Sequence, residues 1–248
     1  MEDAFILGLV QGIAEWLPVS SSGHLVILRY FFGLEGGLSF DVFLHLSALV
    51  VIFIFFRRDI IRVGRAFFTF DRKSYEFRIA LYVIYATVIT GTAGILFGNR
   101  VEGLATIKVV PFMFLITTAL LFLSARKGDG EMNVKRALFI GLMQSVALLP
   151  GISRSGATIS AAKIAGVRNE EAFRFSFLMA IPAIAGAVIY EMKDFKSLPA
   201  SFLLTGFATS LILGLCSLYV LRRIFLSGRL YLFGFYTLTL SILLLVAR

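Results

Sequence analysis

The chain has 248 residues, of which 58% are hydrophobic and only 16% are charged, and its mean hydropathy is +0.90. Soluble domains usually hold about 45–50% apolar and roughly 25% charged residues, so this composition excludes a soluble domain and predicts an all-α integral membrane protein with several spans. The net charge of +9 lies in short loops between hydrophobic runs, where it normally reports orientation, so we expect membrane lipids and no nucleic acid as partners.

The first break in the hydrophobic pattern lies between two short apolar runs, 3–17 and 24–32. Each run is too short to cross about 30 Å of hydrocarbon, which takes about 20 residues. Pro18 and a Ser/Gly cluster separate them. Irregular backbone at membrane depth is tolerated only inside protein or beside a water-filled cavity. We therefore expect a re-entrant helical hairpin, with a single kinked and tilted span as the alternative.

The rest of the chain predicts six full spans and a second hairpin. The hairpin is expected at about 137–166, where Pro150 and Gly151 interrupt an apolar run. Gly94 and Gly98 form a small-xxx-small pair that allows two helices to approach closely. A homodimer is also among the expected assemblies. The six spans are expected at about 39–56, 79–97, 108–125, 171–191, 200–221 and 230–247.

Two segments of the chain resemble each other. Residues 8–23 and 141–156, aligned without a gap at an offset of 133, share seven identities. We therefore expect a single membrane domain, 1–248, built of two repeat halves at about 1–126 and 134–248, each with one hairpin and three spans. The identical pairs are Gly8/Gly141, Leu9/Leu142, Gln11/Gln144, Ala14/Ala147, Ser20/Ser153, Ser22/Ser155 and Gly23/Gly156.

The distribution of basic residues predicts the orientation. Loops 57–78, 126–136 and 222–229 hold seven, four and three Lys or Arg. The basic loops of a polytopic protein face the cytoplasm, so both termini are expected outside a plasma (cell inner) membrane. The two halves then have opposite orientation, and such inverted-topology repeats place sites near the midplane, where broken helices meet. The loops on the other side hold four basic residues, Arg100, Lys108, Lys193 and Lys196.

Several polar side chains would lie at membrane depth. A charge near the bilayer centre costs about 2.5–3.5 kcal/mol on insertion scales, so Glu15 and Arg154 are expected to face the interior and pair. Gln11 and Glu15 lie four residues apart and share one helix face. Ser21 is a candidate nucleophile, and His24 a candidate base or proton donor. A structural salt bridge with a satisfied core histidine is the alternative.

Both polar segments precede a helix. Helix N-termini with free N–H groups and hydroxyls bind anions, above all phosphate, and the planar donors of Arg match phosphate oxygens. If the two segments face each other, they can hold a two-phosphate group. The candidate diphosphate-binding residues are Gln11, Ser20, Ser22, Gly23, Ser153, Ser155, Gly156 and Thr158.

The two hairpins differ at key positions. Leu148 stands at the position equivalent to Glu15, and Arg154 at the position equivalent to Ser21, so one half carries the acid and nucleophile and the other a phosphate clamp. Gln144 is interpreted as packing derived from the repeat. His45, in the first full span, is either a core histidine or part of the cavity wall, and we favour the wall because a polar ring is costly in lipid.

The motifs QGIAEWLPVSSSGH (Gln11–His24) and PGISRSGAT (Pro150–Thr158) resemble the two signatures of the undecaprenyl-diphosphatase family, the bacitracin-resistance phosphatases. The resemblance also covers length, span pattern and inverted repeat. It implies hydrolysis of a polyprenyl diphosphate to polyprenyl phosphate and inorganic phosphate at the outer face of the membrane. This reaction recycles the lipid carrier for cell-envelope polysaccharide synthesis and confers bacitracin resistance. The family's second acid, Ser, His and Arg fall on Glu15, Ser21, His24 and Arg154.

The resemblance also implies a divalent cation, Mg²⁺ or Ca²⁺, both of which prefer oxygen ligands. Glu15 would ligate it, joined by the carbonyl oxygen of Gln11, at a position where the family motif allows Glu or Gln. In the mechanism that we expect, the cation, Arg154 and the Ser loops neutralise the diphosphate. Ser21 or a water then attacks the terminal phosphorus, and His24 or Glu15 handles the proton.

Two other functions remain open on the sequence. Inverted repeats with broken helices are typical of secondary transporters, so the same site could bind a polyprenyl phosphate and flip it. Alternatively, the polar segments only fasten helices in a scaffold without activity. Release of phosphate by the purified protein separates the enzyme from both.

Overall fold

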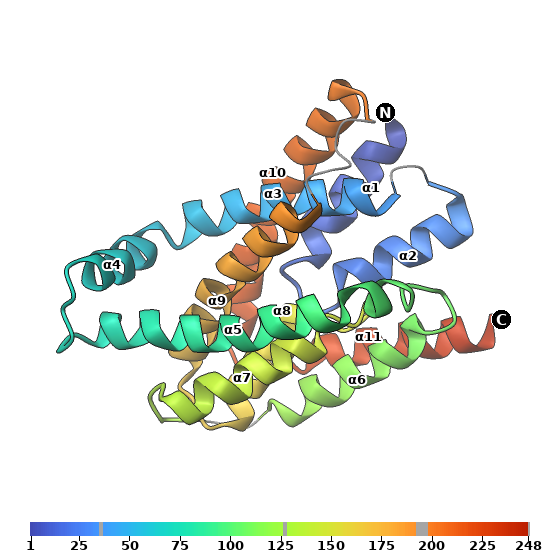
Figure 1. Ribbon diagram of the computed structural model, residues 1–248. Helices are drawn as coiled ribbons and strands as arrows, with labels where there is room; N and C mark the ends of the chain where they lie inside the picture. Colours follow the sequence, from blue (N-terminus) through green and yellow to red (C-terminus); the bar gives the residue numbers. More distant parts are fainter. Residues whose placement is uncertain (35–36, 126–127, 192–197, 248) are drawn as a thin grey trace.

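The described part of the chain is helical, as the composition predicts. This computed structural model describes residues 1–34, 37–125, 128–191 and 198–247, which form eleven helices, and Figure 1 shows their arrangement. Arg126, Lys127, Lys193 and Lys196, which enter the loop prediction, lie outside the described residues. The helices are α1 (Glu2–Ala14), α2 (Ser21–Phe32), α3 (Gly37–Phe55), α4 (Arg57–Phe68), α5 (Tyr75–Glu102), α6 (Val110–Leu123), α7 (Val134–Val146), α8 (Arg154–Ile164), α9 (Asn169–Glu191), α10 (Ala200–Leu226) and α11 (Leu232–Val246).

Each of the six predicted spans contains one helix, but the helices differ in length. Within the described residues, α5, α9 and α10 are long and apolar enough to cross a membrane. The pair α3–α4 passes the same test but is bent by 82°, so it makes a fourth candidate if it counts as one span. Helices α6 and α11 are apolar but have 14 and 15 residues. At 1.5 Å per residue they reach roughly 21–23 Å of the ~30 Å hydrocarbon layer.

The polar stretch that follows the first predicted span is partly helical. Helix α4 occupies its first twelve residues. Asp59 accepts a hydrogen bond from Arg62 one turn later at 2.7 Å, and its carboxylate lies 2.8 Å from Arg174 of α9. Such i,i+3 pairs stabilise a charged helix, and the contact with Arg174 holds α4 against the bundle. The count of Lys and Arg therefore identified this segment as basic, but it did not predict that the segment begins with a helix.

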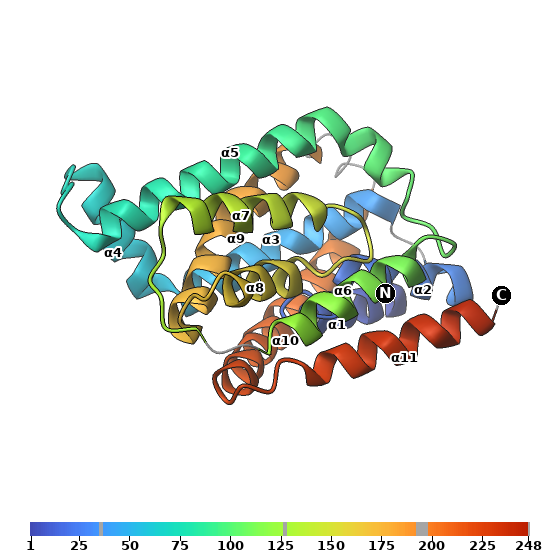
Figure 2. The ribbon, with the colours of Figure 1, turned by 90° about the horizontal axis from the view of Figure 1, so that it is seen from below.

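The helices of the two halves pack in equivalent pairs. If the two predicted repeat halves are matched in chain order with α4 left out, α1 corresponds to α7, α3 to α9, α5 to α10 and α6 to α11. Helix α1 packs along α10 and α7 packs along α5, and these are equivalent contacts (Figures 1 and 2). Corresponding helices also pack on each other, α3 on α9 and α6 on α11. The hairpin of each half therefore packs on a helix of the other half.

Glycines at equivalent positions of the repeat allow two of these contacts. A Cβ on Gly8 of α1 would lie 2.5 Å from the carbonyl oxygen of Gly206 in α10. A Cβ on Gly141 of α7 would lie 2.8 Å from the Cα of Ala86 in α5. The identity of this pair in the sequence repeat thus has a packing reason. By contrast, a Cβ on Gly94 or Gly98 would meet nothing within 4 Å, so the homodimer stays a prediction.

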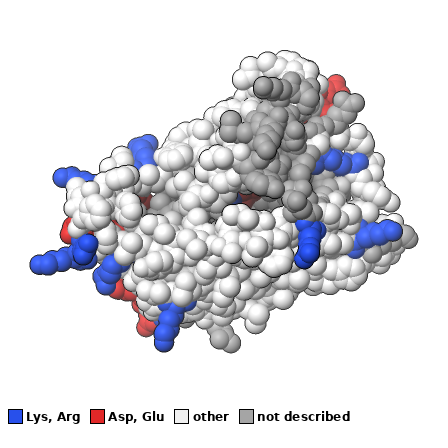
Figure 3. All heavy atoms as spheres, viewed as in Figure 1, with Lys and Arg blue, Asp and Glu red and all other residues white. Residues whose placement is uncertain are grey.

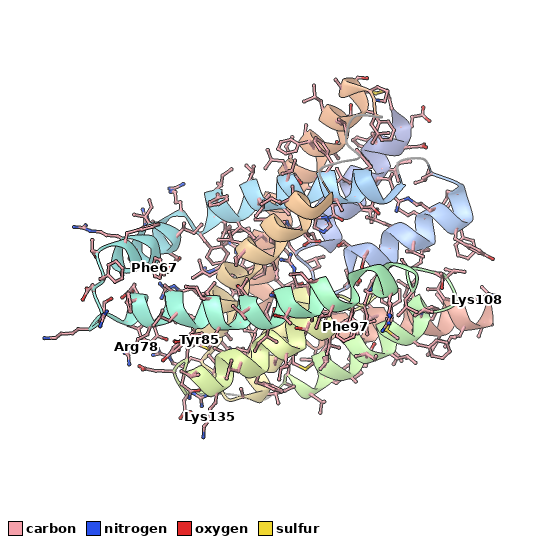
Figure 4. All side chains as sticks on the ribbon, viewed as in Figure 1. Phe67, Arg78, Tyr85, Phe97, Lys108 and Lys135 are labelled. Carbon is pink, nitrogen blue, oxygen red and sulfur yellow. The ribbon has the colours of Figure 1, made fainter. Side chains whose placement is uncertain are left out.

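The two hairpins enter the bundle from opposite ends. In Figure 1 the hairpin α1–α2 opens to the right, where both termini lie, and α7–α8 opens to the left, near α4. More Lys and Arg are visible at the left end than at the right (Figure 3). Figure 4 labels Arg78 and Lys135 at the left end and Lys108 at the right. The tips of the hairpins meet in the middle of the bundle.

Candidate active site

Both hairpin tips end in a serine that caps the second helix. Ser20 is the N-cap of α2 and accepts a hydrogen bond from the N–H of Gly23 at 3.3 Å. Ser153 is the N-cap of α8 and accepts one from the N–H of Gly156 at 3.1 Å. Ser20 has φ 69°, which is uncommon for a residue with a Cβ and marks a tightly constrained turn. The repeated Ser and Gly of the sequence therefore make the same capping hydrogen bond in both hairpins, although only Ser20 has a positive φ.

The two tips are in direct contact. Ser22 of the first hairpin accepts a hydrogen bond from the N–H of Gly151 in the second at 3.3 Å. In return, the hydroxyl of Ser155 donates to the carbonyl of Leu17 at 3.4 Å. Reciprocal contacts of this kind satisfy backbone groups that would otherwise be left unpaired at membrane depth. The predicted meeting of the two broken segments is thus present in the structure.

Glu15 is the centre of the polar network between the tips and is 8% exposed. One carboxylate oxygen accepts a hydrogen bond from Arg154 of the other hairpin. The other accepts from the hydroxyl of Ser21 at 2.7 Å and from Nε2 of Gln11 at 3.1 Å. Nε2 of His45 lies 3.6 Å from the same oxygen. The predicted ion pair of Glu15 and Arg154 is therefore present. The hydroxyl of Ser21, the candidate nucleophile, and the side-chain amide of Gln11 bind the same carboxylate.

The guanidinium of Arg154 is not fully used by this pair. Its Nη2 donates to Glu15, whereas its Nη1 is buried and has no hydrogen-bond partner among the described residues. Buried donors without a partner are rare because the loss of hydration is costly. The free donor therefore points to a missing acceptor, such as a phosphate oxygen.

A cavity of about 220 Å³ opens beside Glu15. Residues from both hairpins and from α3, α5 and α9 line it. Alanine, leucine and isoleucine form the rest of its wall, so the polar groups converge within an apolar surround, as is usual for ligand sites. The polar lining residues are Glu15, Ser20, Ser21, Ser22, His45, Thr90, Gln144, Ser153 and Arg154.

The predicted diphosphate-binding residues fall into two groups. Ser20, Ser22 and Ser153 line the cavity. The others lie behind its wall: Gly23 and Gly156 donate their N–H groups to the capping serines, and the hydroxyl of Thr158 donates to the carbonyl of Arg154 at 3.0 Å. Ser155 and Gln11 are likewise buried behind the wall.

The two histidines lie in different places. Nδ1 of His24 is 2.7 Å from the carbonyl of Ser20, and Nε2 is 2.7 Å from the hydroxyl of Tyr236 in α11. A carbonyl only accepts, so in a neutral ring Nδ1 carries the hydrogen and Nε2 accepts from Tyr236. His24 does not line the cavity, and the structure does not bring it to Glu15. The imidazole beside Glu15 belongs to His45, which confirms the cavity-wall interpretation of that residue.

Sequence reasoning missed two further polar pairs. Arg29 of α2 binds Asp41 of α3 through two hydrogen bonds, at 2.5 and 2.6 Å. The signal was available, because charged residues next to apolar runs are expected to pair. Nε2 of Gln144 donates to Thr90 of α5 at 3.1 Å, and both line the cavity. The repeat pointed to Gln144, but nothing in the sequence distinguished Thr90.

The donor set near Glu15 fits a divalent cation only if the substrate supplies ligands. The described residues contain no group of three or more His, Cys, Asp or Glu that could hold a metal ion. Glu15 offers one carboxylate, and the Oε1 atom of Gln11 is buried without a hydrogen-bond partner among those residues. Mg²⁺ is often bound by one or two carboxylates together with substrate phosphates and waters. The site fits such a shared cation, not a closed protein cage.

Trp16, the residue after Glu15, packs in the hydrophobic core beside α9. It is the only tryptophan of the chain, is 1% exposed, and its ring centroid lies 5.7 Å from that of Phe177 in α9. Its fluorescence can therefore report on unfolding of the core against which the first hairpin packs.

Comparison with known proteins places the whole chain in one group. Residues 4–243 match the family described as "Bacitracin resistance protein BacA". A protein of Methanosphaera stadtmanae named undecaprenyl-diphosphatase is 40% identical, with 98% of this chain and 96% of that protein covered. Proteins of the same name from Thermosipho africanus and Oceanobacillus iheyensis are 36% and 37% identical, covering 96% and 98% of this chain and 96% and 94% of their own lengths.

Proposed function

The chain belongs to the bacitracin resistance protein BacA family of integral membrane proteins, and on that premise we propose that it is an undecaprenyl-diphosphatase. It hydrolyses undecaprenyl diphosphate to undecaprenyl phosphate and inorganic phosphate, a reaction tied to bacitracin resistance. One observation carries this proposal. Two hairpins bring a carboxylate, a serine hydroxyl and an arginine with a free donor together at one small cavity.

The membrane arrangement that we propose is an inverted-topology repeat of six spans and two re-entrant hairpins. The equivalent pairs α1–α10 and α5–α7 support it, as do the opposite ends from which the hairpins enter. With the basic loops at the cytoplasmic side of the plasma membrane, both termini lie outside and the site opens to the outer face. A tag at either terminus should then be cleaved by a protease added outside right-side-out vesicles.

We propose that the diphosphate enters the cavity between the capping serines. Nη1 of Arg154 donates to a phosphate oxygen, while Nη2 stays on Glu15, so one guanidinium orients both the substrate and the carboxylate. The hydroxyls of Ser20, Ser22 and Ser153 can donate to further phosphate oxygens. The isoprenoid tail lies outside the cavity, between lipid-exposed helices.

The contacts of Ser21 favour it as the nucleophile. Its hydroxyl donates to Glu15 at 2.7 Å, the geometry required for transfer of its proton to the carboxylate. Attack of Oγ on the terminal phosphorus forms a phosphoserine and breaks the bond to the bridging oxygen, which leaves with undecaprenyl phosphate. Water then hydrolyses the phosphoserine and releases inorganic phosphate. Direct attack by a water in the same place is the alternative, and it predicts no phosphoserine.

Three other groups support this chemistry in the proposal. His24 acts on the position of the α2 N-terminus through its bond to the carbonyl of Ser20, because Tyr236 occupies its other nitrogen. Gln11 fixes the carboxylate of Glu15. If a divalent cation, Mg²⁺ or Ca²⁺, binds, Glu15 and the free oxygen of Gln11 would hold it, and it would neutralise part of the phosphate charge.

The test is release of phosphate from undecaprenyl diphosphate by the purified protein. Glu15→Gln should abolish release while the protein remains folded, because the glutamine amide cannot take the proton of Ser21. Glu170→Gln removes the same charge from an exposed position at the start of α9 and should leave the rate unchanged. Equal rates for the two variants would contradict the proposal.

The inverted contacts between the halves also favour a second candidate, a polyprenyl-phosphate flippase that uses the same site. A flippase without hydrolysis releases no phosphate in this assay, but it moves a labelled lipid phosphate between the leaflets of a vesicle.

A further inference from the structure

A second cavity lies at the basic end of the molecule and shares no lining residue with the active-site cavity. Its volume is about 320 Å³. The C-terminal ends of α6, α8 and α10, the first residue of α9 and the turn before α11 surround it. None of these segments belongs to the hairpin tips, so the reaction proposed above makes no use of this space.

A buried ammonium group lies in the wall of this cavity. Lys163 is 5% exposed, and its Nζ donates one hydrogen bond, to the side-chain oxygen of Asn169. Among the described residues, no carboxylate oxygen lies within 4.0 Å of Nζ. Because an ammonium carries three N–H donors, two of them remain for other acceptors. Lysine is almost never fully buried unless it is paired, so this arrangement lacks a counter-charge.

The helix that carries Lys163 compensates only part of its charge. Lys163 lies in the last turn of α8, where the helix dipole presents about half a negative charge. The amide oxygen of Asn169 adds a neutral acceptor. Together they account for the position of the lysine but leave a net positive charge and two donors facing the cavity. An anion with several acceptor oxygens would complete the set.

The remaining wall is compatible with a phosphate group. Tyr231 lines the same cavity, and its hydroxyl makes no hydrogen bond within the described residues, so it can serve as a further donor. Arg223 and Arg229 are exposed on the adjoining end of α10 and its following turn, and they raise the local concentration of anions. Phe225 and Leu230 form a buried apolar side. Basic pockets between membrane helices on the cytoplasmic side are suited to phosphate-bearing head groups.

We propose that this cavity is a second anion site, which binds one phosphate group through Lys163 at the end of the molecule opposite to the opening of the active site. The phosphate is either inorganic phosphate or the monoester head group of a lipid. The site is independent of hydrolysis, because Lys163 contacts no residue of the active-site network within the described residues.

Isothermal titration calorimetry of the purified full chain tests this proposal. The background is Arg154→Met, which removes the phosphate-binding arginine of the active site. Two probes are titrated: inorganic phosphate, and dihexanoyl phosphatidic acid below its micellar concentration, with dihexanoyl phosphatidylcholine as the neutral reference. Adding Lys163→Met should weaken binding at least tenfold, and Lys163→Arg should retain it. Lys135→Met, which removes an exposed lysine from the same end of the molecule, should leave binding unchanged.

The two probes identify the source of the phosphate. If inorganic phosphate binds, the ligand of the site is a free anion. If only the lipid monoester binds, the ligand is a lipid head group. Ser227→Asp places a negative charge on the exposed side of the cavity and should also abolish binding. This variant replaces Lys163→Met in the test if Lys163→Met does not fold. The proposal is overturned if neither probe binds the Arg154→Met protein, or if the Lys163→Met and Lys135→Met versions bind equally. Neither result bears on the proposed phosphatase activity, because that activity is measured on protein with wild-type Arg154.

Discussion

The ion pair between Glu15 and Arg154 joins the two hairpin tips, and its two partners should not be equally costly to remove. The Glu15 side chain is 6% exposed, whereas the Arg154 side chain is 19% exposed at the cavity wall. Arg154→Met leaves a nearly buried carboxylate with only Ser21, Gln11 and the more distant His45 as partners. Glu15→Gln leaves a guanidinium that cavity water can hydrate.

The expected magnitudes follow from this difference in exposure. Removing one partner of a buried pair typically costs about 3–5 kcal/mol. Because Ser21 and Gln11 still bind the carboxylate, we expect about 3 kcal/mol for Arg154→Met, and about 1–2 kcal/mol for Glu15→Gln. In the double variant neither charge remains, so its loss of stability should fall short of the sum of the single losses by about 2 kcal/mol.

The fluorescence of Trp16 provides the assay, because it is the only tryptophan and is buried next to Glu15. Unfolding of the four proteins by sodium dodecyl sulfate in mixed micelles, followed at this residue, gives the four free energies of unfolding. The pairing would be refuted if the single losses added to within about 0.5 kcal/mol of the double loss. A larger loss for Glu15→Gln than for Arg154→Met would refute the argument from exposure.

Four further outcomes are expected. Gly8→Ala should destabilise the protein by about 1–3 kcal/mol in the same unfolding assay, because its Cβ would lie 2.5 Å from a carbonyl oxygen of α10, and Gly94→Ala, with open space around it, should not. Ser21→Ala should lower kcat for phosphate release by about 100-fold or more and remove any phosphoserine detected by mass spectrometry; unchanged turnover would favour attack by water. Tyr236→Phe should reduce turnover by less than about tenfold, because it removes only the hydrogen-bond partner of His24. A loss of turnover as large as that of Glu15→Gln would instead indicate that His24 takes part in the reaction. A chelator should stop hydrolysis and added Mg²⁺ or Ca²⁺ should restore it, whereas full activity in chelator would exclude the shared cation.

Much of the site could be predicted because membrane depth restricts what polar residues can do. A proline followed by Ser and Gly inside an apolar run predicted each hairpin, and the cost of an unpaired charge predicted that Glu15 meets Arg154. The repeat predicted a similar polar segment before a helix in each half, and in the structure Ser20 and Ser153 of these segments make the same capping hydrogen bond. These inferences depend on local sequence and on a strong energetic penalty.

What the sequence did not predict depends on partners far away in the chain. The direction of the His24 ring is decided by Tyr236, 212 residues later in the chain. The sequence does not distinguish Thr90 from any other threonine of an apolar span. It lies beside Gln144 because α5 packs on α7. Helix α4 was not predicted because its arginines made the segment look like a polar loop. A count of charges does not take into account the i,i+3 pair of Asp59 and Arg62, which stabilises a helix.

The exchange of packing partners between the halves has a consequence for biosynthesis. Helix α1, which carries Gln11 and is followed directly by Glu15, is synthesised before α10, on which it packs, because α10 begins only at Ala200. Until α10 is made, the surface of α1 around Gly8 lacks the helix on which it packs, although Arg154, the partner of Glu15, is already part of the chain. A chain truncated before Ala200 would thus hold both polar tips and still lack the surface that seats the first of them.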